Sequence, residues 1–321
     1  MRAVVQDGYG AADVLRVADV PRPSPAPGQV LVRVAAVSVN LSDWETLRGD
    51  PLYSRIGGLR RPARRTLGSD IAGRVESVGS GVSRFRAGDE VYGDNLALKG
   101  GFAEFAVAPE SALALKPEGL TFAEASTIPQ AGAIALQGTA TAAAGRRVLI
   151  NGAGGGTGSF AIQLAKRAGA HVTGVDNAGK LDFMRSLGAD EVIDHRSRDF
   201  TRTGERYDLV LDLVATRSAL ACRRALARGG RYRCVGGSVP VLLGIAALGS
   251  IAGPLTGRRL GVLVVRTGPA RFEPLADLCV AGDVGIRIDR TFALDDVPAA
   301  LRHVGEGRAL GKVVVTLPDG A

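Results

Sequence analysis

The glycine-rich stretch Asn151–Gly158, NGAGGGTG, restricts the possible folds of this chain more than any other feature. It follows the apolar run Val148–Ile150 and precedes an alanine-containing run typical of a helix. The spacing Ala153-x-Gly155-x-x-Gly158 predicts a dinucleotide-binding turn: Gly155 lets the backbone approach a pyrophosphate, and Gly158 lets the helix pack on the strand. The alternative is a turn that serves structure alone, because glycine is used wherever a turn is tight.

The residues after this turn supply the rest of a nucleotide-binding unit. The next apolar strand ends in Asp176, 18 residues after Gly158, and an acidic residue there typically binds the ribose hydroxyls of adenosine. Between about residue 120 and residue 267, apolar strands alternate with amphipathic helices, which predicts a doubly wound parallel sheet. This α/β pattern makes nucleotide binding the favoured interpretation of the turn.

The first third of the chain has a different pattern. Short β-branched runs, of which Gln29–Asn40 is the longest, are separated by Pro and Gly, as in small all-β barrels. The tail closes with the strand-like run Lys312–Leu317 and is expected to return to this β domain. We therefore predict a β-barrel domain of residues 1–118 and 268–321, and a nucleotide-binding domain of residues 119–267.

Composition disfavours two classes of partner. The 321 residues carry a formal net charge of +8, with 40 Lys and Arg against 32 Asp and Glu, yet basic clusters are few and aromatic residues make up only 5%. Nucleic acid and membrane surfaces are therefore disfavoured as partners, because stacking platforms for bases are scarce. The basic run Gly58–Arg65 is either a solvated loop or a rim that attracts an anionic ligand.

The cysteines favour a reducing compartment. Cys222, Cys234 and Cys279 match no metal motif or disulfide pattern, so we expect buried thiols and a cytoplasmic protein. The N-terminus has no apolar signal core. The long uncharged run Cys234–Gly257 is interrupted by glycine and proline, which favours an apolar lid or partner surface over a membrane span.

Seven stretches with a characteristic order extend over nearly the whole chain. They are SVNLSDW (Ser38–Trp44), LGSDIAGRVESVG (Leu67–Gly79), AGDEVYG (Ala87–Gly93), GGFAEFAV (Gly100–Val107), NGAGGGTGSFAIQLAK (Asn151–Lys166), LGADEVID (Leu187–Asp194) and GKVVV (Gly311–Val315). Through them the chain resembles the medium-chain dehydrogenase/reductase superfamily, specifically its zinc-independent quinone oxidoreductase-like branch.

The resemblance implies a fold and an activity. The expected fold is a GroES-like β-barrel catalytic domain with a Rossmann domain. The expected activity is NAD(P)H-dependent reduction of quinones or α,β-unsaturated carbonyl compounds, compatible with a tailoring role in a biosynthetic pathway. The resemblance also implies a homodimer in which the edge strand Leu260–Val265 pairs with its copy, since pairing covers an exposed edge.

Positions that bind zinc in related dehydrogenases carry other residues here. Zinc-dependent relatives have Cys where this chain has Asn40, and a His-Glu pair where it has Ser69 and Asp70. Without a cation to polarise a carbonyl or lower the pKa of an alcohol, alcohol oxidation is disfavoured, and no metal is expected. What remains is conjugate reduction, in which hydride leaves nicotinamide C4 and negative charge develops on a carbonyl oxygen.

The resemblance places three catalytic candidates in the first domain: Asn40, Asp43 and Tyr53. The Asn40 amide is the favoured donor to the developing enolate oxygen, and the alternative is a strand-end Asn that caps a turn. Asp43 is expected to orient the cofactor or the surrounding structure. Tyr53 is included because Glu45 stands where many relatives have a Tyr. No side chain is assigned as the proton donor, so the proton is expected to come from solvent water.

Three residues are expected to line the substrate pocket: Trp44, Gln130 and Ile134. Trp44 either forms a wall of the pocket or packs in the core. Ile134 replaces a Thr that lies near the nicotinamide in relatives, and Gln130 is the nearby polar group.

The resemblance assigns cofactor binding to a larger set of positions: Asn151, Gly154, Gly155, Gly156, Thr157, Gly158, Asp176, Asn177, Lys180, His195, Gly236, Gly311 and Lys312. A carboxylate at Asp176 opposes the 2′-phosphate of NADPH. Lys180, in contrast, matches a phosphate-binding Lys of NADPH-dependent relatives, and His195 replaces a Tyr that assists it. Asn177 serves either cofactor, so we expect NADPH and NADH both to be used.

Two other functions are weighed against reduction. A structural or regulatory protein of the same fold that binds the cofactor without turnover is favoured by Glu45 and Ile134, because two expected polar groups are missing. A metal-dependent alcohol dehydrogenase is the least favoured. Fold alone does not decide between them.

Overall fold

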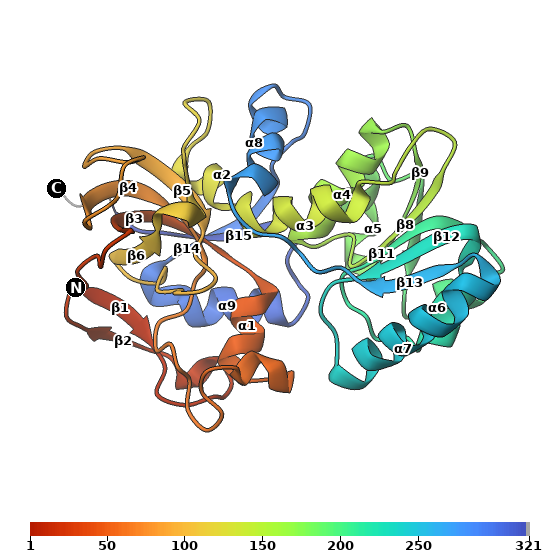
Figure 1. Cartoon of the computed structure of the whole chain (residues 1–321), viewed down its shortest axis with the longest axis horizontal. Coiled ribbons are helices and arrows are strands. Elements are labelled where there is room, and N and C mark those ends of the chain that lie inside the picture. Colours follow the sequence, from red (N-terminus) through yellow and green to blue (C-terminus); the bar gives the residue numbers. More distant parts are fainter. Residues whose placement is uncertain (319–321) are drawn as a thin grey trace. The chain divides into compact units, whose positions relative to one another are not determined.

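The chain divides into two compact units in the computed structural model, which describes residues 1–318 apart from the side chains of residues 250–256. The first unit is Met1–Ala133 with Thr267–Ala321, and the second is Ile134–Arg266 (Figure 1). The division falls within helix α3 (Pro129–Thr139), later than the expected boundary at 118. The reason is that helix α2 (Phe122–Ser126) packs against the sheet of the first unit.

The first unit is built around a seven-stranded sheet. Its strand order is β14-β15-β3-β4-β5-β7, and β6 also pairs with β3. The strands are β3 (Gln29–Val39), β4 (Asp70–Val78), β5 (Glu90–Asp94), β6 (Phe105–Pro109), β7 (Leu113–Leu115), β14 (Ile288–Ala293) and β15 (Lys312–Thr316). The long β-branched run is thus a strand as predicted, and the C-terminal tail returns to this sheet because β15 pairs antiparallel with β3.

The remaining elements of the first unit cover this sheet or extend it. An antiparallel pair is formed by β1 (Arg2–Val5) and β2 (Arg16–Asp19). The helices are α1 (Leu41–Arg48), α8 (Glu273–Val280) and α9 (Val297–Gly305). Helix α1 packs tightly on α9, since a Cβ on Gly305 would lie 2.2 Å from the Trp44 ring.

The second unit is a six-stranded parallel sheet of order β10-β9-β8-β11-β12-β13. The strands are β8 (Arg147–Asn151), β9 (His171–Asp176), β10 (Glu191–Asp194), β11 (Tyr207–Asp212), β12 (Leu226–Cys234) and β13 (Arg259–Val262). This is the 3-2-1-4-5-6 order of dinucleotide-binding sheets, so the predicted doubly wound sheet is confirmed. Leu260 lies in β13, which is an edge strand of this sheet as predicted.

Helices cover both faces of the parallel sheet. α4 (Gly156–Arg167) and α5 (Leu181–Ser186) lie on one face, and α6 (Ala219–Arg224) and α7 (Val239–Thr256) lie on the other (Figure 1). Helix α4 begins at Gly156, so the last residues of the glycine turn already belong to the helix.

The apolar run Cys234–Gly257 contributes the end of β12 and helix α7. Within the part of the chain that the structure describes, none of the helices has the length and apolar character needed to cross a bilayer. The side chains of residues 250–256 lie outside that part, so the expectation of a lid or partner surface there stays a prediction.

Candidate functional site

The glycine turn joins β8 to α4 at the carboxyl edge of the parallel sheet. A Cβ on Gly158 would lie 2.4 Å from the carbonyl oxygen of Gly152 and 2.5 Å from Ala153 Cα, so the close packing of helix on strand admits no side chain there. At Gly155 the nearest atom would be 3.5 Å away, which leaves that backbone open to a ligand. The first N–H groups of α4 have no helical acceptor and carry the positive end of the dipole. The turn therefore fits a pyrophosphate.

Asp176, at the end of β9, lies against this turn. The Gly154 N–H donates to Asp176 Oδ2 at 3.0 Å, and the Asn177 N–H donates to Oδ1 at 2.9 Å. Lys180 Nζ is 3.6 Å from Asp176 Oδ1, and these side chains are only 7% and 12% exposed. The backbone N–H of His195 donates to the Asp176 carbonyl at 2.9 Å, while the His195 side chain is exposed. The structure thus brings together the acid, the lysine and the turn that the sequence predicts.

Two further predicted cofactor residues lie at the ends of strands in this unit. Asn151 Nδ2 donates to Asp212 Oδ1 at 2.8 Å, and the Tyr232 hydroxyl donates to Asp212 Oδ2 at 2.7 Å. A buried carboxylate therefore fixes the Asn151 side chain at the carboxyl edge of the sheet. Gly236, just after β12, has a φ of +74°, a backbone conformation that favours glycine.

Four neighbouring strands of the first unit bring polar residues to one end of their sheet. β15 begins at Lys312, β3 ends just before Asn40, β4 begins at Asp70 and β5 ends at Asp94. The register of β3 with β15 and β4, and of β4 with β5, places these residues in a row. We call the following set the buried polar cluster: Asn40, Asp43, Asp70, Asp94, Lys99 and Lys312, each no more than 9% exposed.

Asn40 is at the centre of the hydrogen bonds in this cluster. Its Nδ2 donates to Asp70 Oδ2 at 2.9 Å, and Lys312 Nζ donates to its Oδ1 at 2.8 Å. The Gln130 backbone N–H donates to both oxygens of Asp70 at 3.2 Å, and the Ser42 hydroxyl donates to Gln130 Oε1 at 3.0 Å. Asn40 and Gln130 are therefore linked through the Asp70 carboxylate. The structure also brings the Lys312 side chain into contact with Asn40, within the first unit.

Asp43 holds the junction between β3 and α1. Its Oδ2 accepts from the Asn40 backbone N–H at 3.1 Å, and its Oδ1 accepts from the Gly68 N–H at 3.2 Å. Lys99 Nζ lies 3.6 Å from Asp43 Oδ1. Because Asp43 is fully buried and bonded to backbone on both sides, these contacts support its structural role.

Burial shifts the acid–base properties of this cluster. It raises the pKa of Asp70 well above the ordinary value; Asp94 adds to the rise, while Lys312 opposes it. Burial, and then the charge of Asp43, raises the pKa of Asp94 to about 6. Burial lowers the pKa of Lys312, and Asp70 opposes that change most strongly. Each of these side chains is therefore stable in its charged form only because opposite charges and hydrogen-bond donors nearby offset the cost of burial.

Other predicted residues lie around this cluster. Trp44 packs against α9 and the hydrophobic core, so the structure supports the core alternative for its ring. Tyr53 is partly buried in the 3-10 helix Leu52–Arg55. Burial, with a smaller contribution from Asp50, raises the pKa of Glu45 to about 7. Ile134 belongs to the second unit.

Sequence reasoning missed Asp94 and Lys99. The signal for Asp94 was weak: an acid at the end of a short strand in GDEVYGD, with no indication that β5 pairs with β4. Lys99 has a φ of +54°, and nothing in its surrounding sequence indicates a buried lysine. Among the described residues, no group of three or more His, Cys, Asp or Glu side chains is arranged to hold a metal ion.

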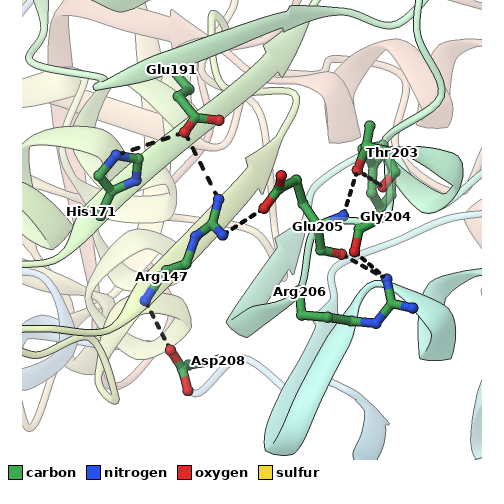
Figure 2. Close-up of polar contacts among 9 residues, drawn as sticks. Arg147, His171, Glu191, Thr203, Gly204, Glu205, Arg206 and Asp208 are labelled. Atoms are coloured by element: carbon green, nitrogen blue, oxygen red, sulfur yellow. Dashed lines mark hydrogen bonds and ion pairs between the residues drawn. The ribbon is translucent and has the colours of Figure 1, made fainter.

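A second group of charged residues lies at the opposite, amino-terminal edge of the parallel sheet (Figure 2). We call Arg147, His171, Glu191, Glu205 and Asp208 the exposed ion network. Arg147 donates to Glu205 at 2.6 Å and lies 3.8 Å from Glu191, which is also 3.8 Å from His171. The Arg147 backbone N–H donates to Asp208 at 2.9 Å. The ion-paired side chains of Arg147, Glu191, Glu205 and His171 are 36–47% exposed.

A sheet in 3-2-1-4-5-6 order with an open glycine turn, joined in one chain to a β unit with a buried polar cluster, defines a two-domain nucleotide-dependent dehydrogenase fold. Residues 26–118 match the family model described as alcohol dehydrogenase GroES-like domain, and residues 187–315 match that described as zinc-binding dehydrogenase.

Named proteins are similar over nearly the full chain. A 2-methylene-furan-3-one reductase of Solanum lycopersicum is 33% identical over 98% of this chain and 79% of its own. The solved quinone oxidoreductase of Coxiella burnetii has a TM-score of 0.88 at 28% identity, with 99% of each chain covered. A mycobacterial protein solved in complex with NADPH has a TM-score of 0.84 at 27% identity, covering 99% of this chain and all of its own. The chain belongs to the quinone oxidoreductase-like branch of the medium-chain dehydrogenase/reductase superfamily.

Proposed function

We propose that this protein is an NAD(P)H-dependent reductase of quinones or α,β-unsaturated carbonyl compounds. The observation that carries the proposal is the open glycine turn at Gly155 in a sheet of dinucleotide-binding order. The similar proteins named quinone oxidoreductase and 2-methylene-furan-3-one reductase support the substrate class. The similar protein solved with NADPH supports the cofactor. Bound NAD(P)H supplies the hydride.

The chain's own residues have separable roles in this proposal. The turn Gly154–Gly158 and the start of α4 hold the pyrophosphate, and Asp176 with Lys180 receives the adenosine ribose. The Asn40 amide donates a hydrogen bond to the substrate oxygen on which negative charge develops. This donor acts without a metal ion, which is why we propose a zinc-independent enzyme.

Steady-state turnover tests the proposal directly. NAD(P)H oxidation is measured with a panel of quinones and enones, and a saturated ketone and a primary alcohol with oxidised cofactor are the controls. We expect turnover with at least one quinone or enone and none with the controls. Tight cofactor binding with no turnover on any member of the panel would favour the second candidate, a cofactor-binding protein without activity. The features behind that candidate are Glu45 and Ile134, at positions where the family resemblance implies a Tyr and a Thr.

Cofactor choice depends on the pair Asp176 and Lys180. We propose that both cofactors are used, because Lys180 offsets the carboxylate that opposes the 2′-phosphate of NADPH. Asp176→Ser should raise the preference for NADPH over NADH by roughly tenfold, about 1.4 kcal/mol. Dissociation constants for both cofactors measure it. The matched control is Asp182→Ser, at an exposed acid of α5. Unchanged constants for both cofactors would refute the assignment of Asp176.

We also propose a homodimer in which β13 pairs with its copy. The edge position of β13 supports this proposal, because an unpaired edge strand invites pairing. A monomeric mass in light scattering at micromolar concentration would contradict it. The buried thiols of Cys222 and Cys234 support a cytoplasmic location, which cell fractionation can check.

A further inference from the structure

The end of the first unit's sheet contains a side-chain arrangement that fixes the orientation of one amide. Asn40 is held between the cation of Lys312 and the carboxylate of Asp70, at 2.8 Å and 2.9 Å. An ammonium group can only donate and a carboxylate can only accept. The amide oxygen must therefore face Lys312 and the amide nitrogen must face Asp70, and the reverse orientation would break both bonds.

Strand pairing fixes this arrangement, because it sets the backbone positions of Asn40, Lys312 and Asp70. β15 pairs with β3 so that Val313 lies opposite Val39, and Lys312 and Asn40 are the adjoining residues. β4 pairs with β3 so that Asp70 lies opposite Ser38. Two different neighbouring strands thus deliver the two partners of the same amide.

The two contacts leave one amide hydrogen unused. Asn40 Nδ2 carries two hydrogens, and Asp70 accepts one of them. Within residues 1–318 the recorded contacts show no second protein acceptor for this nitrogen. A cation on the oxygen of an amide polarises it, and in a poorly solvated site this strengthens the hydrogen bond that the nitrogen donates.

We propose that Lys312 is a positioning residue that acts through Asn40: it fixes and polarises the amide so that the remaining hydrogen is presented to the substrate carbonyl oxygen. The proposal rests on the proposed reductase function and differs from the cofactor-binding role that the family resemblance implies for Lys312. The Lys312 side chain touches Asn40, and the residue is 2% exposed. Its effect therefore belongs to the chemical step rather than to cofactor affinity.

The principal test compares Lys312→Met with Lys312→Arg. Lys312→Met should lower kcat by roughly 10- to 100-fold, less than the loss expected when the donor itself is removed. The NADPH dissociation constant should stay within about twofold of wild type, since cofactor affinity is not involved. Lys312→Arg should restore part of kcat because it keeps the cation. An unchanged kcat with weakened NADPH binding would overturn the proposal.

Lys116→Met is the matched control for loss of a buried lysine. Lys116 also lies in the first unit, its side chain is 7% exposed, and its ammonium pairs with Glu90. It has no recorded contact with Asn40 among the described residues. An equal loss of kcat in Lys116→Met and Lys312→Met would show general destabilisation and would overturn the positioning role.

A double-mutant cycle isolates the action through Asn40. If Lys312 acts only through the amide, Asn40→Ala with Lys312→Met should lower kcat no further than Asn40→Ala alone. Multiplying effects would overturn the proposal. Thermal midpoints of the same four proteins test the contact without activity, and strictly additive shifts would overturn it too. Absence of wild-type turnover would refute the proposed function separately, while the thermal cycle still decides whether Lys312 and Asn40 are coupled.

Discussion

The buried polar cluster of the first unit and the exposed ion network of the second contain similar residue types in different surroundings. Both combine acids with one or two strong bases at the end of a sheet. Members of the buried polar cluster are at most 9% exposed, whereas Arg147 and Glu205 in the exposed ion network are 36% and 43% exposed. Water weakens the interactions in the second group, whereas in the first each buried charge carries a desolvation cost that its partners offset only in part.

The difference shows in what each group can do. In the buried polar cluster the pKa values of Asp70, Asp94 and Lys312 are displaced by burial. Such perturbed groups mark functional sites more often than exposed ion pairs do. The exposed ion network instead ties together the strand ends Arg147, His171 and Glu191 at the edge away from the glycine turn. Substitutions should separate the two groups by the size of their effects.

The largest effect is expected from the only amide in the buried polar cluster. Asn40→Ala removes the donor that the proposed mechanism uses at the developing negative charge. We expect kcat to fall about 100- to 1000-fold, about 2.7–4 kcal/mol of transition-state stabilisation. The NADPH dissociation constant should not change, because the proposed cofactor residues Gly154–Gly158, Asp176 and Lys180 lie in the second unit. A kcat within a factor of two of wild type would remove Asn40 from the mechanism.

A pH-dependent effect of intermediate size is expected at Asp94. Its pKa is raised to about 6 by burial and by Asp43, so the folded state binds this proton more tightly than the unfolded chain does. Stability should therefore fall as the pH rises from about 4 to about 6, and above that the ionised carboxylate costs on the order of 3 kcal/mol.

Asp94→Asn removes that cost without changing the shape of the side chain. The free energy of unfolding of the variant should exceed that of wild type by about 2–3 kcal/mol at about pH 8. Near pH 4 the two proteins should differ little. Urea unfolding at both pH values measures this. If the difference in free energy of unfolding between variant and wild type does not depend on pH, ionisation of the Asp94 carboxyl group is not its cause.

The smallest effect is expected in the exposed ion network. Glu205→Gln is the same carboxylate-to-amide change, and it removes the 2.6 Å bond to Arg147. Because water and salt screen this pair, we expect a loss below about 1 kcal/mol, shrinking further in high salt. Thermal unfolding at low and high salt measures it. A loss as large as that of a buried charge would erase the distinction between the two groups.

The fold could be predicted from the sequence largely because its strongest signals are local. The strand before Gly152, the glycine spacing and Asp176 specify one βαβ unit, and the β-branched run Gln29–Asn40 specifies one strand. The compact first unit extends to Ala133, beyond the expected boundary at 118, since a short helix such as α2 gives no local sign of which sheet it joins.

The site was harder to predict because it depends on strand pairing. Asn40 and Gln130 could be named from the resemblance, but Asp94 enters the site only because β5 pairs with β4. Lys312 was expected at the cofactor, and its contact with Asn40 follows from the register of β15 on β3. Register depends on contacts distant in sequence, and residue patterns near Lys312 do not encode it.

The contact between Lys312 and Asn40 joins residues 272 positions apart. During synthesis Asn40, Asp70 and Asp94 leave the ribosome long before Lys312 exists, and the whole parallel sheet of residues 134–266 is made in between. Until β15 docks on β3, Lys99 is the one cation of the buried polar cluster already present, beside Asp43 and Asp94. Asp70 still lacks Lys312 and is costly to bury as an ion. The nucleotide-binding unit can thus be finished first, and the proposed reaction centre is completed only when the last strand of the chain arrives.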